Sequence, residues 1–160
     1  MKSASAAALI ALTAALGLAT SASAAASADD CEGRPTQTKL TVQVTGVRAA
    51  KGEMAITLYP DDAKRFLAPH QKLARVRAVA QAPMTTACFW LPAPGFYALA
   101  VYHDENGNRD FDRTLVGLPA EGFAFSNDPP TPTALPPFKS VRFKAGDGES
   151  TMRVKLKYLK

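Results

Sequence analysis

The chain has 160 residues, of which 47% are hydrophobic and 21% are charged, and its formal net charge at pH 7 is +5. This mild positive charge does not indicate a nucleic-acid-binding protein. The length predicts one domain with a core of its own. The sequence contains no Gly-x-Ser-x-Gly, no His-Glu-x-x-His and no phosphate-binding glycine loop, which removes the common signatures of hydrolases, metalloproteases and nucleotide-binding enzymes.

The N-terminus has the pattern of a secretory signal peptide. Lys2 supplies a positive start, an alanine- and leucine-rich run continues to Leu18, and Ala22-Ser23-Ala24 places small residues where a signal peptidase cleaves. The apolar run is too short to span a membrane stably, and no second run of about 20 apolar residues follows it. We therefore expect residues 1–24 to be removed, and a periplasmic or secreted protein that is not transmembrane.

Residues 25–38 are expected to be an N-terminal tail and residues 39–160 a single domain. Cys31 does not directly follow the small residues of the signal, as a lipid-carrying cysteine would, so we expect a soluble product. Cleavage takes one lysine from the 19 basic residues and none of the 14 acidic ones, which leaves a net charge of +4. An oxidising compartment allows a Cys31–Cys88 disulfide, which would contribute about 3–4 kcal/mol. Two buried thiols are the alternative.

Two strands are expected at the start of the domain. From Lys39, the apolar residues Leu40, Val42 and Val44 alternate with polar ones, which is typical of a half-buried strand. The same period of two returns at residues 54–59, after a turn that contains two glycines. The two segments are therefore predicted to form a β-hairpin.

The middle of the chain is expected to hold a short helical turn and further strands. The helical turn is predicted at Asp61–Leu67, before Pro69, and spans about two turns at most. Strands are predicted at residues 74–82, 85–91 and 96–102. The last of these is apolar on both faces, which predicts a central position in a sheet.

The C-terminal part is expected to begin irregularly and to end in a second hairpin. Residues 115–128 are predicted to be loop with one short strand, and five prolines between residues 129 and 137 exclude regular structure there. Alternating apolar residues at 141–144 and 152–158 flank the turn Gly146-Asp147-Gly148. This pattern predicts the hairpin.

Together these segments predict an all-β fold. About seven short strands favour an immunoglobulin-like or prealbumin-like antiparallel β-sandwich over a parallel α/β fold. A true immunoglobulin domain places its tryptophan between its two cysteines, whereas Trp90 follows Cys88 here, so only the architecture is predicted. Trp90 and Tyr97 flank a proline- and glycine-containing turn, where they either pack in the core or stack on a sugar.

Basic residues of the predicted C-terminal hairpin form a candidate binding surface. They are expected on one face of two neighbouring strands, where like charges are unfavourable unless they are solvated or matched by an anion. An anionic envelope component, lipid or acidic polysaccharide, is the partner that this surface would fit. A solvated face that protects an edge strand from aggregation is the alternative. The residues are Arg142, Lys144, Arg153, Lys155 and Lys157.

The polar segment after the predicted central strand has the spacing of a calcium-binding loop. Oxygen-bearing side chains occur at every second position from residue 104 to residue 112, and hard cations such as Ca²⁺ need several oxygen ligands at once. Ca²⁺ is the only cofactor that the sequence predicts. The candidate ligands are Asp104, Asn106, Asn108, Asp110 and Asp112, with Asp110 contributing its carboxylate or its backbone carbonyl.

This loop departs from the calcium-loop pattern at two positions. The sixth, usually glycine, is Arg109, and the twelfth, usually a bidentate glutamate, is Leu115. Arg109 and Arg113 also offset the negative charge of the loop. We therefore expect weak affinity, with a Kd of about 0.1–1 mM. A polar turn, in which Asp and Asn side chains hydrogen-bond their own backbone, is the alternative.

Three stretches of the sequence resemble an uncharacterised bacterial envelope family, the domain-of-unknown-function family 2141. They are Ala100–Asn108, Gly117–Asn127 and Pro136–Phe138. The resemblance extends from Leu40 to Leu156. Members resemble secreted β-sandwich proteins, so the resemblance implies this fold but no activity. Their loop usually has glycine at the position of Arg109.

These features lead to one main hypothesis and two alternatives for the function. The first is a non-catalytic, exported envelope protein that binds Ca²⁺ weakly in the loop. The second is a binding module for anionic envelope lipid or polysaccharide. The third is a hydrolase in which His103 acts with the acidic loop, although His103 ends a strand and is expected to face solvent. We assign no catalytic residue.

Overall fold

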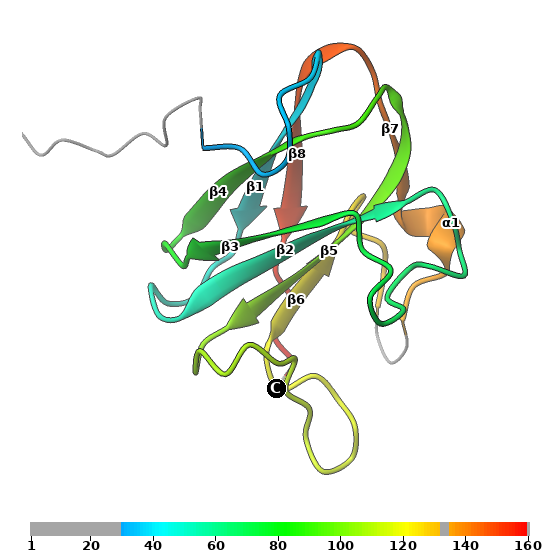
Figure 1. Cartoon of the computed structure of the whole chain (residues 1–160). Helices are drawn as coiled ribbons and strands as arrows, with labels where there is room; N and C mark the ends of the chain where they lie inside the picture. Colours follow the sequence, from blue (N-terminus) through cyan, green and yellow to red (C-terminus); the bar gives the residue numbers. More distant parts are fainter. Residues whose placement is uncertain (1–29, 132–134, 160) are drawn as a thin grey trace, which may run out of the picture.

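A computed structural model describes residues 30–131 and 135–159. These residues form two β-sheets that pack against each other (Figure 1). The signal peptide expected at residues 1–24 and its cleavage site lie outside the described residues. The strands are β1 (Thr38–Thr45), β2 (Glu53–Pro60), β3 (Ala74–Val79), β4 (Met84–Trp90), β5 (Gly95–Asp104), β6 (Gly122–Phe125), β7 (Arg142–Ala145) and β8 (Gly148–Lys155). The three-stranded sheet has the order β4-β1-β8, and the five-stranded sheet has the order β3-β2-β5-β6, with β7 also paired to β5.

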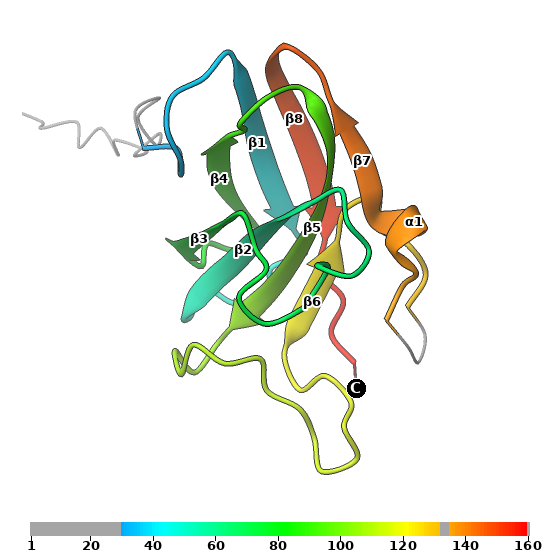
Figure 2. The ribbon, with the colours of Figure 1, turned by 45° about the vertical axis from the view of Figure 1, so that its right-hand side comes forward.

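The prediction of an all-β sandwich is confirmed. The described residues form eight strands rather than about seven, and the β1–β8 pair is parallel while the other strand pairs are antiparallel. Figure 2 shows β8 beside β1, so that the last strand lies next to the first. Within the described residues, no helix has the length and apolar character that crossing a membrane requires.

The main core lies between the two sheets. Leu40, Val42 and Val44 of β1 are buried, as their alternation predicts, and they belong to one cluster with apolar side chains of β2 and β5. Each fully buried aliphatic side chain of this kind contributes about 1.5–3 kcal/mol. The predicted central strand, β5, is indeed central, because β2, β6 and β7 all pair with it.

Both predicted hairpins are wrong. β1 pairs with β4 and β8, whereas β2 pairs with β3 and β5, so the chain crosses from one sheet to the other between β1 and β2. The chain crosses again between β7, which pairs with β5, and β8, which pairs with β1. An alternating pattern determines which face of a strand is buried but not which strand lies beside it.

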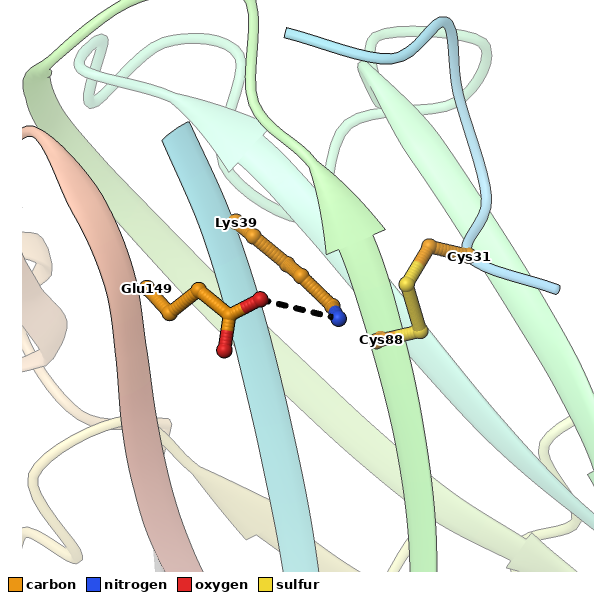
Figure 3. Close-up of a disulfide and its surroundings, with 4 residues drawn as sticks. All are labelled: Cys31, Lys39, Cys88 and Glu149. Carbon is orange, nitrogen blue, oxygen red and sulfur yellow. Dashed lines mark hydrogen bonds and ion pairs between the residues drawn. A yellow bond between two sulfur atoms is a disulfide. The ribbon is translucent and has the colours of Figure 1, made fainter. Parts of the chain in front are cut away.

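The predicted disulfide between Cys31 and Cys88 is present, and it ties the N-terminal tail to β4 (Figure 3). The tail also hydrogen-bonds the backbone of this strand, through Glu32 N to Cys88 O and Trp90 N to Glu32 O. Because the two cysteines are 57 residues apart, the crosslink contributes about 4 kcal/mol by loop-closure entropy. Lys39 and Glu149 form an ion pair between β1 and β8 (Figure 3).

A second apolar cluster covers the other face of the five-stranded sheet. Tyr59, Phe123 and Phe125 project from this face, and Phe66 and Phe138 pack on them from two connecting segments. Phe66 lies in the segment predicted as a helical turn, which is a turn closed by Asp62 rather than a helix. Phe138 starts the short helix α1 (Phe138–Val141), directly after the proline-rich segment. Apolar side chains therefore pack on both faces of the five-stranded sheet.

Candidate functional site

The acidic loop connects β5 to β6 and extends from one end of the five-stranded sheet (Figures 1 and 2). β5 ends at Asp104, and His103 pairs with Gly122 of β6. Continuing this antiparallel register by one residue puts Asp104 opposite Glu121. The fold thus brings the first predicted ligand of the loop next to an acidic residue that follows the loop.

Three predicted ligands lie together in the loop. Asn106 Nδ2 donates to Asp112 Oδ2 at 2.7 Å, and Asn108 Nδ2 donates to Asp112 Oδ1 at 3.0 Å. The amide oxygens accept backbone N–H groups, Asn106 Oδ1 from Asn108 and Asn108 Oδ1 from Asp110. Asp110 takes part through its N–H, and its side chain is exposed. Asn106, Asn108 and Asp112 therefore contact one another, and the two amide oxygens accept N–H groups two residues on, as in the polar turn that was the alternative.

Asp104 is fully buried at the start of the loop. Its Oδ2 accepts the Arg109 N–H at 2.8 Å and an Arg77 N–H at 3.3 Å, while its Oδ1 is buried without a hydrogen-bond partner. Gly52 packs against the same residue, since a Cβ at position 52 would lie 1.9 Å from Asp104 O. Only glycine fits there, so the connection between β1 and β2 packs directly against the backbone of Asp104.

Glu121 is the site residue that the sequence did not reveal. It is only 5% exposed, and its Oε2 accepts the Asp112 N–H at 3.2 Å, while its Oε1 is buried without a partner. Burial raises the pKa of Glu121, and the negative charges of Asp112 and Asp104 raise it further, whereas hydrogen bonds from the backbone of Asp112 and of Glu105 lower it. Glu121 is nine residues from Asp112 in a loop of irregular length, so no fixed spacing marks it.

Two carboxylate oxygens, Asp104 Oδ1 and Glu121 Oε1, are therefore buried without a partner at one end of the β5–β6 pair. Buried polar atoms are almost always hydrogen-bonded or bound to an ion, and exceptions need a physical reason. Within the described residues, no group of three or more His, Cys, Asp or Glu side chains is arranged to hold a metal ion by itself. A cation here would need a mixed set of carboxylate, amide and backbone oxygens, which is the ligand set that Ca²⁺ accepts.

Arg77 supplies positive charge on one side of this cluster. Its Nη1 contacts Asp104 Oδ2 at 3.3 Å and Glu53 Oε2 at 3.4 Å, and its Nη2 donates to Tyr102 Oη at 2.8 Å and to Arg109 O at 3.0 Å. Burial lowers the pKa of Arg77, but the contacts with Tyr102, Glu53 and Asp104 outweigh it and raise the pKa. Arg77 therefore offsets the negative charge at Asp104 Oδ2, whereas Asp104 Oδ1 has no hydrogen-bond partner.

Arg109 adopts the backbone conformation that calcium loops usually give to glycine. Its φ is 66°, in the left-handed region, and Gly107 has a φ of 72°. For a residue with a Cβ, this conformation costs about 1–2 kcal/mol. The Arg109 side chain is 71% exposed, and its Nε lies 3.9 Å from Glu53 Oε2. The substitution thus changes the charge and the strain of the loop but not its path.

Glu105 does not belong to the cluster. Arg48 Nε donates to its Oε1 at 2.8 Å, and the second guanidinium nitrogen contacts Oε2. The hydrogen bond from Arg48 holds the pKa of Glu105 below its usual value. Glu105, at the second loop position, points to the opposite side from Asp104 because successive side chains of a strand alternate. Its charge is offset there by Arg48.

His103 is fully buried, so the prediction of a solvent-facing histidine is wrong. Its Nε2 lies 2.7 Å from Lys51 O, to which it donates because a carbonyl can only accept, and its Nδ1 lies 2.8 Å from Tyr158 Oη. Tyr158 follows the last strand and covers the end of β5. With both nitrogens engaged and shielded, His103 offers nothing to a substrate, so a hydrolase gains no support.

The five basic residues predicted as one surface come from two different sheets and the segment after β8. Arg142 and Lys144 are on β7 of the five-stranded sheet, and Arg153 and Lys155 are on β8 of the other sheet. Arg142 Nη2 pairs with Asp61 Oδ2 at 2.7 Å, and Lys157 Nζ donates to Pro129 O and Thr131 Oγ1. The hairpin on which this surface was predicted is not formed, because β7 pairs with β5 and β8 with β1.

The two aromatic residues beside the proline-containing turn have different environments. Tyr97 is buried, donates to Ala93 O at 2.6 Å and packs near Phe143 in the core. Trp90 is half-buried at the end of β4, with Lys39 Nζ 5.5 Å from the centre of its ring. Tyr97 therefore packs in the core and is not free to stack on a sugar.

Comparison with known proteins identifies a family but no activity. A family described as an uncharacterized protein conserved in bacteria, domain of unknown function 2141, matches residues 42–153. This range includes the acidic loop and Glu121. No curated protein and no solved structure matches the chain.

Proposed function

The chain belongs to this family of bacterial proteins of unknown function, and from its site we propose that it is an exported, non-catalytic β-sandwich protein of the cell envelope that binds Ca²⁺ weakly. The observation that carries the proposal is the pair of buried carboxylate oxygens, Asp104 Oδ1 and Glu121 Oε1, that have no hydrogen-bond partner. Leaving such atoms unsatisfied costs about 1–3 kcal/mol each. A bound cation would remove this cost.

The donor chemistry favours Ca²⁺ over other cations. The available ligands are oxygens of Asp104, Glu121, Asp112 and two asparagines, without sulfur or an available imidazole, which disfavours zinc and copper. Ca²⁺ accepts six to eight oxygens in flexible geometry, whereas Mg²⁺ demands a near-octahedral set. An irregular loop with amide and backbone oxygens suits the larger ion.

Three features of the site support weak affinity. Asn106 and Asn108 donate to Asp112, and ion binding would exchange these bonds for oxygen–cation contacts. Arg77 already balances one oxygen of Asp104, and Arg109 adds positive charge near the loop. A Kd of about 0.1–1 mM is typical of calcium sites outside the cytoplasm. Such a site is useful only where calcium is abundant, which agrees with the signal-peptide pattern and the disulfide.

The absence of a catalytic role is supported by the state of His103. Its two ring nitrogens are occupied by Lys51 O and Tyr158 Oη, and it is fully buried. The other histidine, His70, lies in an exposed turn between β2 and β3. Neither has the geometry of a general base next to an accessible nucleophile.

Thermal unfolding of the chain from residue 25 onward tests the proposal. At 10 mM CaCl₂, a site with the expected affinity stabilises by about 2 kcal/mol, which raises Tm by roughly 5–10 °C for a domain of this size. Asp104→Ala should lose the increase, and Asp147→Asn, in the exposed turn before β8, should keep it. If calcium does not raise the Tm of the wild-type protein, the proposal that the protein binds Ca²⁺ is wrong.

A further inference from the structure

A cavity lies on the face of the five-stranded sheet that points away from the main core. Arg75 of β3, Thr57 of β2, Ala100 of β5 and Phe125 of β6 are register partners and form one row across this face. Thr57 and Ala100 are small, while Tyr59, Tyr102 and Phe123 beside them are large. The row therefore leaves a hollow at its centre, with aromatic rings on its sides.

The hollow has a volume of about 370 Å³, which is within the range of small-molecule sites. Phe111 and Leu118 from the loop between β5 and β6 and Leu159 from the C-terminal segment complete its walls. The rings of Tyr102, Phe111 and Phe123 form a continuous series of edge contacts, with centroids 5.5 Å and 6.4 Å apart. This wall is aromatic and mostly apolar.

Two arginines give the hollow a positive charge. Arg75 and Arg113 line it, and no aspartate or glutamate does. Arg75 Nε donates to Thr57 Oγ1 at 2.8 Å, and Arg113 Nη1 donates to Gly117 O at 3.0 Å. Within the described residues, neither forms an ion pair with a carboxylate, whereas Arg48, Arg77 and Arg142 all do. Both retain N–H donors for an anion.

The rim of the hollow is apolar and exposed. The turn closed by the Arg113–Pro119 bridge, whose ends line the hollow, also carries Leu115 and Val116, which do not line it and are 107% and 80% exposed. Leu118 and Leu135, which line the hollow, are 42% and 60% exposed. Large apolar side chains grouped in this way mark a surface that receives an apolar partner.

The geometry points to a binding site for an anionic amphiphile, a single-chain carboxylate whose head contacts Arg75 and Arg113 and whose chain lies on the aromatic wall. The two arginines exclude a cationic ligand. The few polar groups of the wall disfavour a sugar, which needs many hydrogen-bond partners. This site is distinct from the proposed calcium site, and the inference does not depend on calcium binding.

Isothermal titration with decanoate, below its critical micelle concentration, tests the inference on the protein from residue 25 onward. Wild-type protein should bind decanoate at least tenfold more tightly than decanol, because a charge-assisted pair with arginine is worth at least this factor. Arg75→Gln and Arg113→Gln should each weaken decanoate binding about tenfold and leave decanol binding unchanged. Arg153→Gln, on the exposed face of β8, is the matched control and should bind like wild type.

Ala100→Leu should fill the floor of the hollow and abolish binding of both compounds. Near-ultraviolet circular dichroism must show that this variant keeps its fold; if it does not, the two arginine variants decide. Equal affinity for decanoate and decanol, or no binding, would overturn the inference.

Binding to phosphatidylglycerol vesicles tests whether the protein contacts a membrane surface instead of a free amphiphile. Binding to vesicles without binding to free decanoate would also overturn it, because the exposed turn would then be the contact.

Discussion

Asp104 and Glu121 directly follow and precede the His103–Gly122 pair, the last register pair of β5 and β6, and each has one buried carboxylate oxygen without a hydrogen-bond partner. The other oxygen of each accepts a backbone N–H of the loop, from Arg109 and from Asp112 respectively. The two carboxylates thus hold the loop at both ends. Any ion bound between them would connect β5, β6 and the loop.

Replacement of Arg109 separates the charge and the strain of the loop. Arg109→Gly removes both the positive charge and the left-handed strain, so it should raise the free energy of unfolding without calcium by about 1 kcal/mol and also tighten calcium binding. Arg109→Ala removes the charge but keeps the Cβ, so only calcium binding should tighten. Urea unfolding and calcium titration of both variants check this. Equal calcium affinity in wild type and both variants would contradict a role for the Arg109 charge.

His103 is expected to stabilise the fold without taking part in a reaction. His103→Ala should lower the free energy of unfolding by about 2–4 kcal/mol, because it leaves a cavity and two unpaired partners. Tyr158→Phe removes one hydrogen bond and should cost about 1 kcal/mol. Urea unfolding measures both. Wild-type stability in His103→Ala would show that the two contacts of the ring are not important.

The calcium loop and the amphiphile site should be coupled. Asp112 belongs to the loop cluster, and Phe111 and Arg113, its two neighbours in sequence, line the hollow. Calcium should therefore order one wall of the hollow and raise decanoate affinity severalfold, and by reciprocity decanoate should raise calcium affinity by the same factor. Titration of decanoate with and without 10 mM calcium measures this factor, with Asp104→Ala as the uncoupled control. Decanoate binding that is independent of calcium would contradict the coupling of the two sites.

Asp61 and Arg142 provide a pH-dependent contact between the turn after β2 and β7. The hydrogen bond from Arg142 lowers the pKa of Asp61. A lowered pKa in the folded state means that the contact stabilises above the unfolded pKa and is lost as pH falls through the folded pKa. Because Asp61 is exposed, the effect on stability is small, so the carboxyl resonance should be followed by NMR. Its midpoint should rise in Arg142→Gln, and an unchanged midpoint would contradict the contact.

The sequence pattern predicted the faces of the strands better than their partners. Leu40, Val42 and Val44 are buried as expected, since burial of every second residue is a local property of a strand. That β1 pairs with β8, more than 100 residues later, is determined by packing of the whole sandwich. For this reason both hairpins were predicted wrongly, including the one on which the basic surface was predicted.

The same distinction applies to the candidate site. Asn106, Asn108 and Asp112 follow one another in a short loop and contact each other, whereas Asp104 accepts hydrogen bonds from Arg109 and Arg77. Glu121 enters through the pairing of β5 with β6 and is not visible as a motif. His103 was expected in solvent because it ends a strand, but Tyr158 from the C-terminal segment covers it.

Calorimetric titration of Ca²⁺ into wild-type protein and Glu121→Gln tests the central claim most directly. Wild type should bind one ion with a Kd of about 0.1–1 mM, and Glu121→Gln should bind at least tenfold more weakly while unfolding at no lower temperature without calcium. Glu149→Gln, at the exposed end of β8, controls for the loss of one carboxylate and should bind like wild type. No binding by the wild-type protein, or equal affinity in Glu121→Gln, would contradict a calcium site built on Asp104 and Glu121.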